Sequence, residues 1–202
     1  MSVSDAKAEL LEQLKYNKPL SDACVNLIDG LVAAGGEAPP PEGWWRGAFI
    51  LNSCNEFNRW LRKISGPLLD GAPVTVTVEE DGALHLETDM LVVSCATGLR
   101  VFGSVTSEPS HPESASVTLA ACDFFEPSEE FGITKALEKC EEKLRPKMPS
   151  AAAPKTASLE LRYADDDLIL AWLRADGEED RPLVISRVLD ERTMEVMRAR
   201  RG

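Results

Sequence analysis

The chain has 202 residues, of which 44% are hydrophobic and 28% are charged, a composition typical of globular domains. Its 34 acidic residues outnumber its 22 basic residues and leave a formal net charge of −12. This charge repels phosphate backbones and anionic surfaces, which argues against nucleic-acid binding as the main function. No apolar run approaches the roughly 20 residues that span a bilayer.

The first residues carry neither a basic end with an apolar block, as in a secretory signal, nor the acid-poor composition of a transit peptide. We therefore expect either a cytosolic protein or a mature chain whose leader has been removed. The five cysteines are widely spaced, form no CxxC pair and have no histidine at metal-ligand spacing. The sequence accordingly predicts reduced thiols, no metal site and no cofactor.

The N-terminal residues have a helical pattern. Leucines at 10, 11 and 14 share one helix face behind a cap at Ser4 or Asp5, and a second helix begins after Ser21. Gly35 and Gly36 end this second helix, and three prolines at 39–41 form a rigid linker. We expect residues 1–38 to form a helical segment that packs on the following domain, over one mouth of its barrel.

From residue 43 onward the chain has the alternation and turn signals of short strands. Val74–Val78 alternates with threonine, and Asp81-Gly82 is a hairpin signal. The remaining expected strands are 43–51, 83–88, 90–95, 99–105, 116–122, 159–163, 168–173 and 182–188. We also expect a short helix at 55–64, a helix near 128–144 inserted between late strands, and a final strand or helix at 193–198.

These elements predict a mainly β protein with helical additions, in the α+β class. Eight to ten mostly antiparallel strands without βαβ units indicate a closed or nearly closed antiparallel barrel over residues 39–202. A barrel of about eight strands has room for its own side chains or for one small ligand.

Two motifs resemble the plastid lipid-associated protein, or fibrillin, family. GWWRGAFILNS (43–53) is similar to the family segment G-x-W-x-L-x-Y-T-S, and YADDDLILAWLR (163–174) is similar to Y-L-D-D-D-L-R-I-x-R. The chain differs from the family at Ile50 and Leu51, where the family has Tyr-Thr, and at Ile169, where the family has a positively charged arginine. The resemblance implies a lipocalin-like barrel that binds lipids, carotenoids or quinones, and a location at plastid membranes such as thylakoids, or at lipid droplets. Without the resemblance, a cytoplasmic location is expected.

An apolar ligand needs contact area and few polar anchors, so aromatic residues are the candidate pocket lining. We predict that the ligand-binding residues are Trp45, Phe49, Phe102, Tyr163 and Trp172. The alternative is that the same rings fill the core. Trp44 and Trp45 are adjacent in an expected strand, so one ring should face inward and the other outward.

Other candidate sites have structural interpretations. Asp165–Asp167 lacks the glycine-bearing loop of a calcium site and is expected to be a solvated turn. Within the resemblance, Asp165 and Asp167 fix this turn by binding backbone amides. His85 lies between two leucines and should face away from them, toward the surface. No GxSxG, Walker, GxGxxG or HExxH motif is present, so we expect that the protein is not an enzyme.

Three functional hypotheses remain open. The first is a non-enzymatic carrier of an apolar small molecule. The second is a structural protein that docks on a membrane surface or a thylakoid protein complex, with its barrel filled by its own side chains. The third is a chromophore-lyase-like barrel that uses a cysteine or glutamate near its mouth.

Overall fold

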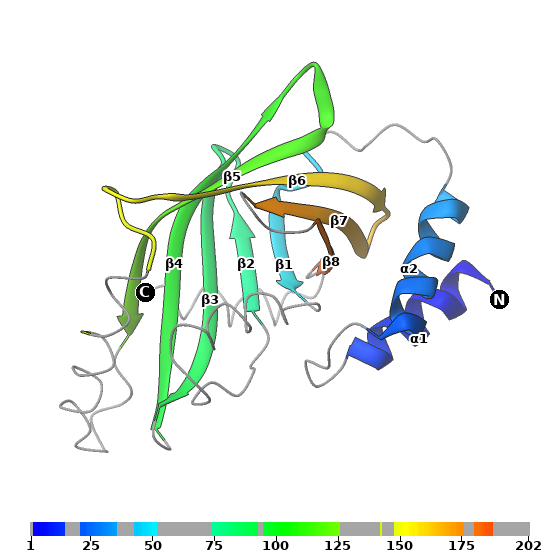
Figure 1. Cartoon of the computed structure of the whole chain (residues 1–202), viewed down its shortest axis with the longest axis horizontal. Helices are drawn as coiled ribbons and strands as arrows, with labels where there is room; N and C mark the ends of the chain where they lie inside the picture. The colour runs from blue at the N-terminus through cyan, green and yellow to red at the C-terminus, as the bar shows by residue number, and fades with distance from the viewer. Residues whose placement is uncertain are drawn as a thin grey trace.

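The computed structural model describes residues 2–14, 21–35, 43–51, 74–92, 95–125, 142, 148–175 and 180–187. Within these residues, two helices and eight strands follow one another (Figure 1). The helices are α1 (Val3–Leu14) and α2 (Asp22–Gly35). The strands are β1 (Gly47–Leu51), β2 (Val74–Val78), β3 (Ala83–Val92), β4 (Cys95–Glu108), β5 (His111–Phe125), β6 (Lys155–Ala164), β7 (Leu168–Ala175) and β8 (Arg181–Arg187).

The strands form one closed barrel in which each strand pairs with its sequence neighbours, and β8 pairs with β1. All eight of these pairings are antiparallel, so the predicted antiparallel barrel without βαβ units is confirmed for the described strands. The expected Asp81-Gly82 hairpin joins β2 to β3, where Gly82 has a φ of +88° that favours glycine.

Several strand boundaries differ from the sequence prediction. Residues 83–92 form one strand instead of two, because β3 continues to pair with β4 as far as Val92. The segment before β1 is a turn and not part of the strand. Gly43 at the start of this turn and Gly47 after it have φ values of +63° and +122°, which interrupt the extended conformation of the backbone. The helices expected at 55–64 and near 128–144, the element at 193–198 and the boundary at 38–39 lie outside the described residues.

Local hydrogen bonds fix where the two helices begin. Before α1, the Asp5 amide donates to Ser2 Oγ at 3.1 Å, and the Ser2 amide donates to Asp5 Oδ2 at 3.2 Å, which is a reciprocal capping box. The cap is therefore Ser2 and not Ser4 or Asp5 as expected. Before α2, the Cys24 amide donates to Ser21 Oγ at 3.3 Å, as the sequence indicated.

The two helices pack beside the barrel, on the outer face of β7 and β8 (Figure 1). The sequence favoured a position over one mouth. The contact instead buries outward-facing side chains of the barrel wall together with the apolar faces of both helices. Its buried members are Ala6, Leu10, Leu14, Cys24, Leu27, Ile28, Leu31, Leu168, Leu170 and Val184. Because the barrel core buries its other face, β7 is buried on both sides from Leu168 to Ala171.

Candidate ligand-binding interior

The inner face of the barrel follows from the alternation of the strands and from their register. Val76 of β2 is paired with Phe49 on one side and with Leu86 on the other, so these three side chains point into the barrel. Leu159 and Ile185 contact the same interior clusters from β6 and β8. Apolar side chains from opposite walls therefore line a common interior.

One end of the barrel is closed by the turn that precedes β1. Trp44 is buried, with 2% of its surface exposed, and its indole Nε1 donates to the Pro112 carbonyl at 2.9 Å. Pro112 belongs to β5, which is four strands away from β1 around a ring of eight and therefore on the opposite wall. The Trp44 side chain thus spans this mouth, which we call the closed mouth.

Arg187, the last residue of β8, binds the turn that precedes β1 through its guanidinium group. Its Nη2 donates to the Trp44 carbonyl at 3.0 Å, and its Nη1 lies 3.4 Å from the Arg46 carbonyl. Its guanidinium also lies over the Phe49 ring, 5.4 Å from the centroid, in a cation–π contact. Closure of β8 onto β1, which pairs Phe49 with Arg187, brings these groups together.

Several interior side chains of the barrel remain partly accessible. Trp44, Trp45 and Phe49 are at most 8% exposed. Six inward-facing aliphatic residues are half-buried, and they are Val76, Leu86, Leu159, Leu161, Leu173 and Ile185. They lie beside Leu51, Val74 and Leu183, which are buried. A side chain that points into a closed barrel and keeps solvent-accessible surface borders space that packing has not filled.

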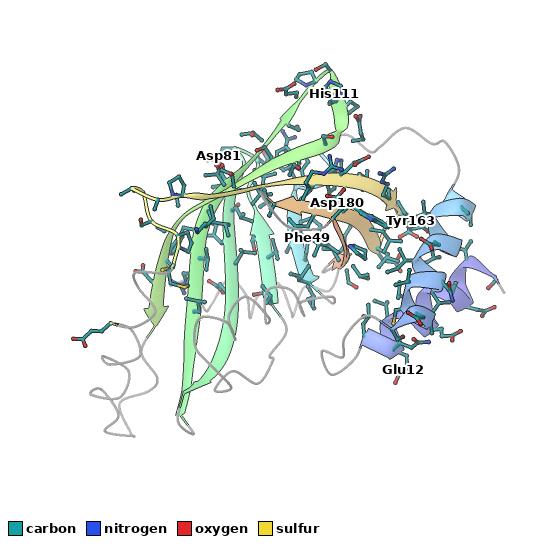
Figure 2. All side chains as sticks on the ribbon, in the orientation of Figure 1. Glu12, Phe49, Asp81, His111, Tyr163 and Asp180 are labelled. Carbon is teal, nitrogen blue, oxygen red and sulfur yellow. The ribbon has the colours of Figure 1, made fainter. Side chains whose placement is uncertain are left out.

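The five aromatic residues predicted to bind ligand lie on two sides of the barrel wall. Trp45 and Phe49 belong to the interior cluster. Tyr163 and Trp172 pack against the helices, and Figure 2 shows Tyr163 between the barrel and the helices. Phe102 is paired with His85, and their rings meet edge to face at 5.4 Å. Since the neighbours of His85 point inward, this pair is on the outer face, where His85 was expected. The five residues therefore do not share one lining, and their role in ligand binding remains a prediction.

The turn between β6 and β7 is held by Asp165. Its Oδ1 accepts hydrogen bonds from the amides of Leu168 at 2.9 Å and Asp167 at 3.2 Å, as the resemblance implied for Asp165. Its Oδ2 accepts from the Tyr163 hydroxyl and from Lys7 Nζ of α1, the latter at 2.8 Å. This carboxylate therefore joins the turn to the first helix.

The charges in this cluster move the pKa values of its members apart. Burial works to raise the pKa of Asp165, but hydrogen bonds from Lys7 and Tyr163 outweigh it and hold that pKa well below its usual range. Burial also works to lower the pKa of Lys7, and its hydrogen bonds to Asp165 and Asp167 raise it overall. Burial and the hydrogen bond to Asp165 both raise the pKa of Tyr163, to about 12.

The part of the chain that the structure describes does not meet the requirements of a metal site, of a membrane-spanning helix or, at Cys24, of a reactive thiol. Within it, no group of three or more histidine, cysteine, aspartate or glutamate residues is arranged to hold a metal ion. No helix there is both long enough and apolar enough to cross a membrane. Cys24 is buried, and its thiol contacts Gln13 Oε1 at 3.2 Å, consistent with a structural thiol.

The described strands form an eight-stranded antiparallel barrel that is closed at the end near Trp44 and has an apolar lining. Comparison with family models, curated proteins and solved structures found no match to this chain. The proposals below therefore depend on the geometry of the barrel and on the motifs in the sequence.

Proposed function

We propose that this protein is a non-enzymatic binding protein for an apolar small molecule, such as a lipid, a carotenoid or a quinone, which it carries inside the barrel. The observation that supports this proposal is the set of half-buried, inward-facing aliphatic side chains in the barrel interior. Binding pockets for such ligands are concave and mostly apolar, and the mouth of a β-barrel is a common place for them.

The resemblance of residues 43–53 and 163–174 to the plastid lipid-associated family extends this proposal to the location of the protein. On that basis, the protein acts at plastid membranes such as thylakoids, where apolar ligands are abundant. A membrane surface or a thylakoid protein complex is then its second partner.

A pair of adjacent substitutions on β2 tests the proposal. Val76→Phe adds a ring to the interior, whereas Thr77→Phe adds the same ring to the outer face, where Thr77 is paired with His85. Aromatic residues suit strands, so both variants should fold. Carotenoids, quinones and fatty acids are titrated while tryptophan fluorescence is recorded, and thermal melting checks that each variant is folded.

We expect Val76→Phe to bind at least about tenfold more weakly than the wild type, a change of about 1.4 kcal/mol, and Thr77→Phe to bind normally. If the folded Val76→Phe variant binds as tightly as the wild type, the ligand is not inside the barrel. If no compound saturates the wild type below about 100 μM, the carrier proposal fails and the docking-scaffold hypothesis replaces it.

A further inference from the structure

Two arginine side chains, those of Arg46 and Arg187, lie along the turn of residues 43–47 at the closed mouth. Nη1 of Arg187 lies 3.4 Å from the Arg46 carbonyl. Each guanidinium also lies over a buried ring of the interior cluster. Arg46 is 4.8 Å from the centroid of Trp45, and Arg187 is 5.4 Å from that of Phe49. These contacts hold both cations in place before a ligand arrives, which lowers the entropy cost of binding.

Glycines at both ends of this turn leave space beside the guanidinium groups. A Cβ on Gly43 would lie 3.2 Å from Arg46 Nη1, and a Cβ on Gly47 would lie 3.9 Å from Arg187 Nη1. Both glycines have positive φ values, which disfavour any side chain there. The surface next to each guanidinium is therefore backbone alone, so a small ion can approach it closely.

Neither arginine forms an ion pair within the part of the chain that the structure describes, although acidic residues outnumber basic ones by 34 to 22. Arg187 has more N–H donors than its two bonds to backbone carbonyls use, and the Arg46 side chain donates to no described acceptor. Other described cations do have carboxylate partners, and they are Lys7, Arg100, Arg162 and Arg174.

We propose that the closed mouth binds a phosphate group, as free phosphate or as a phosphate monoester, between Arg46 and Arg187. The planar guanidinium pairs with phosphate through two parallel hydrogen bonds, and two such cations match an ion with a charge of about −2. Arg46 is exposed and Arg187 is half-buried, so the ion arrives from solvent without entering the barrel. This inference goes beyond the proposed carrier function and does not rest on it.

The net charge of −12 does not prevent such binding. At an ionic strength of about 0.15 M the Debye length is about 8 Å, so distant acidic residues are largely screened. Two acids that border the mouth are already engaged. The Asp167 carboxylate binds Lys7, and the Glu113 carboxylate lies against His111. The two guanidinium groups therefore dominate the local field that the ion meets.

Titration of the full chain with inorganic phosphate tests the proposal, at constant ionic strength and with calorimetry as the readout. Tryptophan emission is recorded in parallel, because Arg46 lies on the Trp45 ring. Two charge-assisted contacts correspond to a dissociation constant of about 1 mM. We expect Arg46→Gln to weaken binding by about tenfold. This variant should fold, since the Arg46 side chain donates no described hydrogen bond that the fold needs.

Arg162→Gln is the matched control. Arg162 also lies over a tryptophan ring, that of Trp172, but it has a carboxylate partner in Glu160 at 2.9 Å. The control removes the same charge from the protein and should leave phosphate binding unchanged. Arg187→Lys keeps the charge and loses the planar fork, so it should weaken binding by at least about threefold. Thermal melting without phosphate checks that each variant is folded.

Glycerol 3-phosphate and vesicles of phosphatidylcholine with phosphatidate distinguish the sources of the phosphate group. Binding of the vesicles that Arg46→Gln abolishes assigns the site to a lipid headgroup, and binding of the soluble ions alone assigns it to a soluble phosphate. The proposal is overturned if none of the three saturates the wild type below about 20 mM phosphate. Equal losses in Arg46→Gln and Arg162→Gln, or a loss in only one of the Arg46 and Arg187 variants, would also overturn it. None of these measurements involves an apolar ligand, so the carrier function stands or falls separately.

Discussion

Replacing Asp165 by asparagine should separate the two tasks of this side chain. The carboxamide of the Asp165→Asn variant keeps an oxygen that can accept from the backbone amide of Leu168, which lies 2.9 Å from Oδ1 in the wild type. The substitution removes the negative charge of Asp165, whose Oδ2 lies 2.8 Å from Lys7 Nζ and also accepts a hydrogen bond from the Tyr163 hydroxyl. The substitution therefore weakens the attachment of α1 to the barrel and preserves the turn between β6 and β7.

The geometry sets the size of the effect. A hydrogen bond to a charged group contributes about 1.5–3 kcal/mol, and solvent screening lowers this for exposed pairs. The side chains of Lys7 and Asp165 are 18% and 29% exposed, so this pair lies between the buried and exposed cases. We expect Asp165→Asn to lower the free energy of unfolding by about 1.5 kcal/mol. Asp165→Ala, which also breaks the turn, should lower it by about 1 kcal/mol more.

The assay is urea denaturation followed by tryptophan fluorescence and far-UV circular dichroism, in a double-mutant cycle with Lys7→Met. We expect a coupling energy of about 1 kcal/mol between the two positions. Asp180→Asn is the matched control, because Asp180 pairs with Arg174 in a more exposed bridge, whose side chains are 41% and 60% exposed, and should change stability less. A coupling near zero, or equal effects at positions 165 and 180, would refute the role of this ion pair.

The pH dependence of the same variant has a definite sign. The folded-state pKa of Asp165 lies below its unfolded value of about 3.8. Its contribution to stability is therefore fully present above about pH 4 and is lost as the pH falls toward the folded-state pKa. The stability difference between wild type and Asp165→Asn should be constant from pH 5 to 8 and smaller at pH 3. A difference that grows on acidification would contradict the assignment.

Two further predictions test individual residues. The phenol of Tyr163 should ionise near pH 12, since burial and Asp165 raise its pKa. The measurement is an ultraviolet pH titration of the difference in absorbance between the wild type and Tyr163→Phe, and a midpoint near pH 10 would contradict the prediction. Gly103→Ala should lower the free energy of unfolding by about 1–3 kcal/mol, because a Cβ there would overlap the Thr118 carbonyl oxygen. Gly30→Ala in α2, where a Cβ meets nothing within 4 Å, should instead stabilise the protein by up to about 1 kcal/mol, and equal effects at the two glycines would refute the steric argument.

The antiparallel barrel could be predicted because its signals are local. The alternation at Val74–Val78 and the turn at Asp81-Gly82 each specify a strand or a hairpin from a few adjacent residues. Prediction of the inner face was harder where a strand is buried on both sides. Leu168–Leu173 is apolar at every position, so alternation alone could not tell whether Trp172 points into the barrel or toward a helix.

The closed mouth could not be found from the sequence, because its parts come from distant segments. The turn at Gly43–Trp45 had a signal in the two glycines at 43 and 47, which permit conformations that a regular strand excludes. Arg187 had no local signal. An arginine at the end of a strand is usually solvated, and only the pairing of β8 with β1 places this one against the turn.

The closed mouth and the helices are connected through one short turn. The carboxylate of Asp165 binds Lys7 of α1, and two residues later the Asp167 carbonyl accepts from the Arg187 amide at 2.9 Å. The Arg187 side chain in turn holds the Trp44 carbonyl. A continuous chain of polar contacts therefore leads from α1 to the tryptophan that closes the barrel. Loss of the ion pair alone, as in Asp165→Asn, should therefore leave this mouth in place, whereas Asp165→Ala, which also breaks the turn, should loosen both the helices and the mouth.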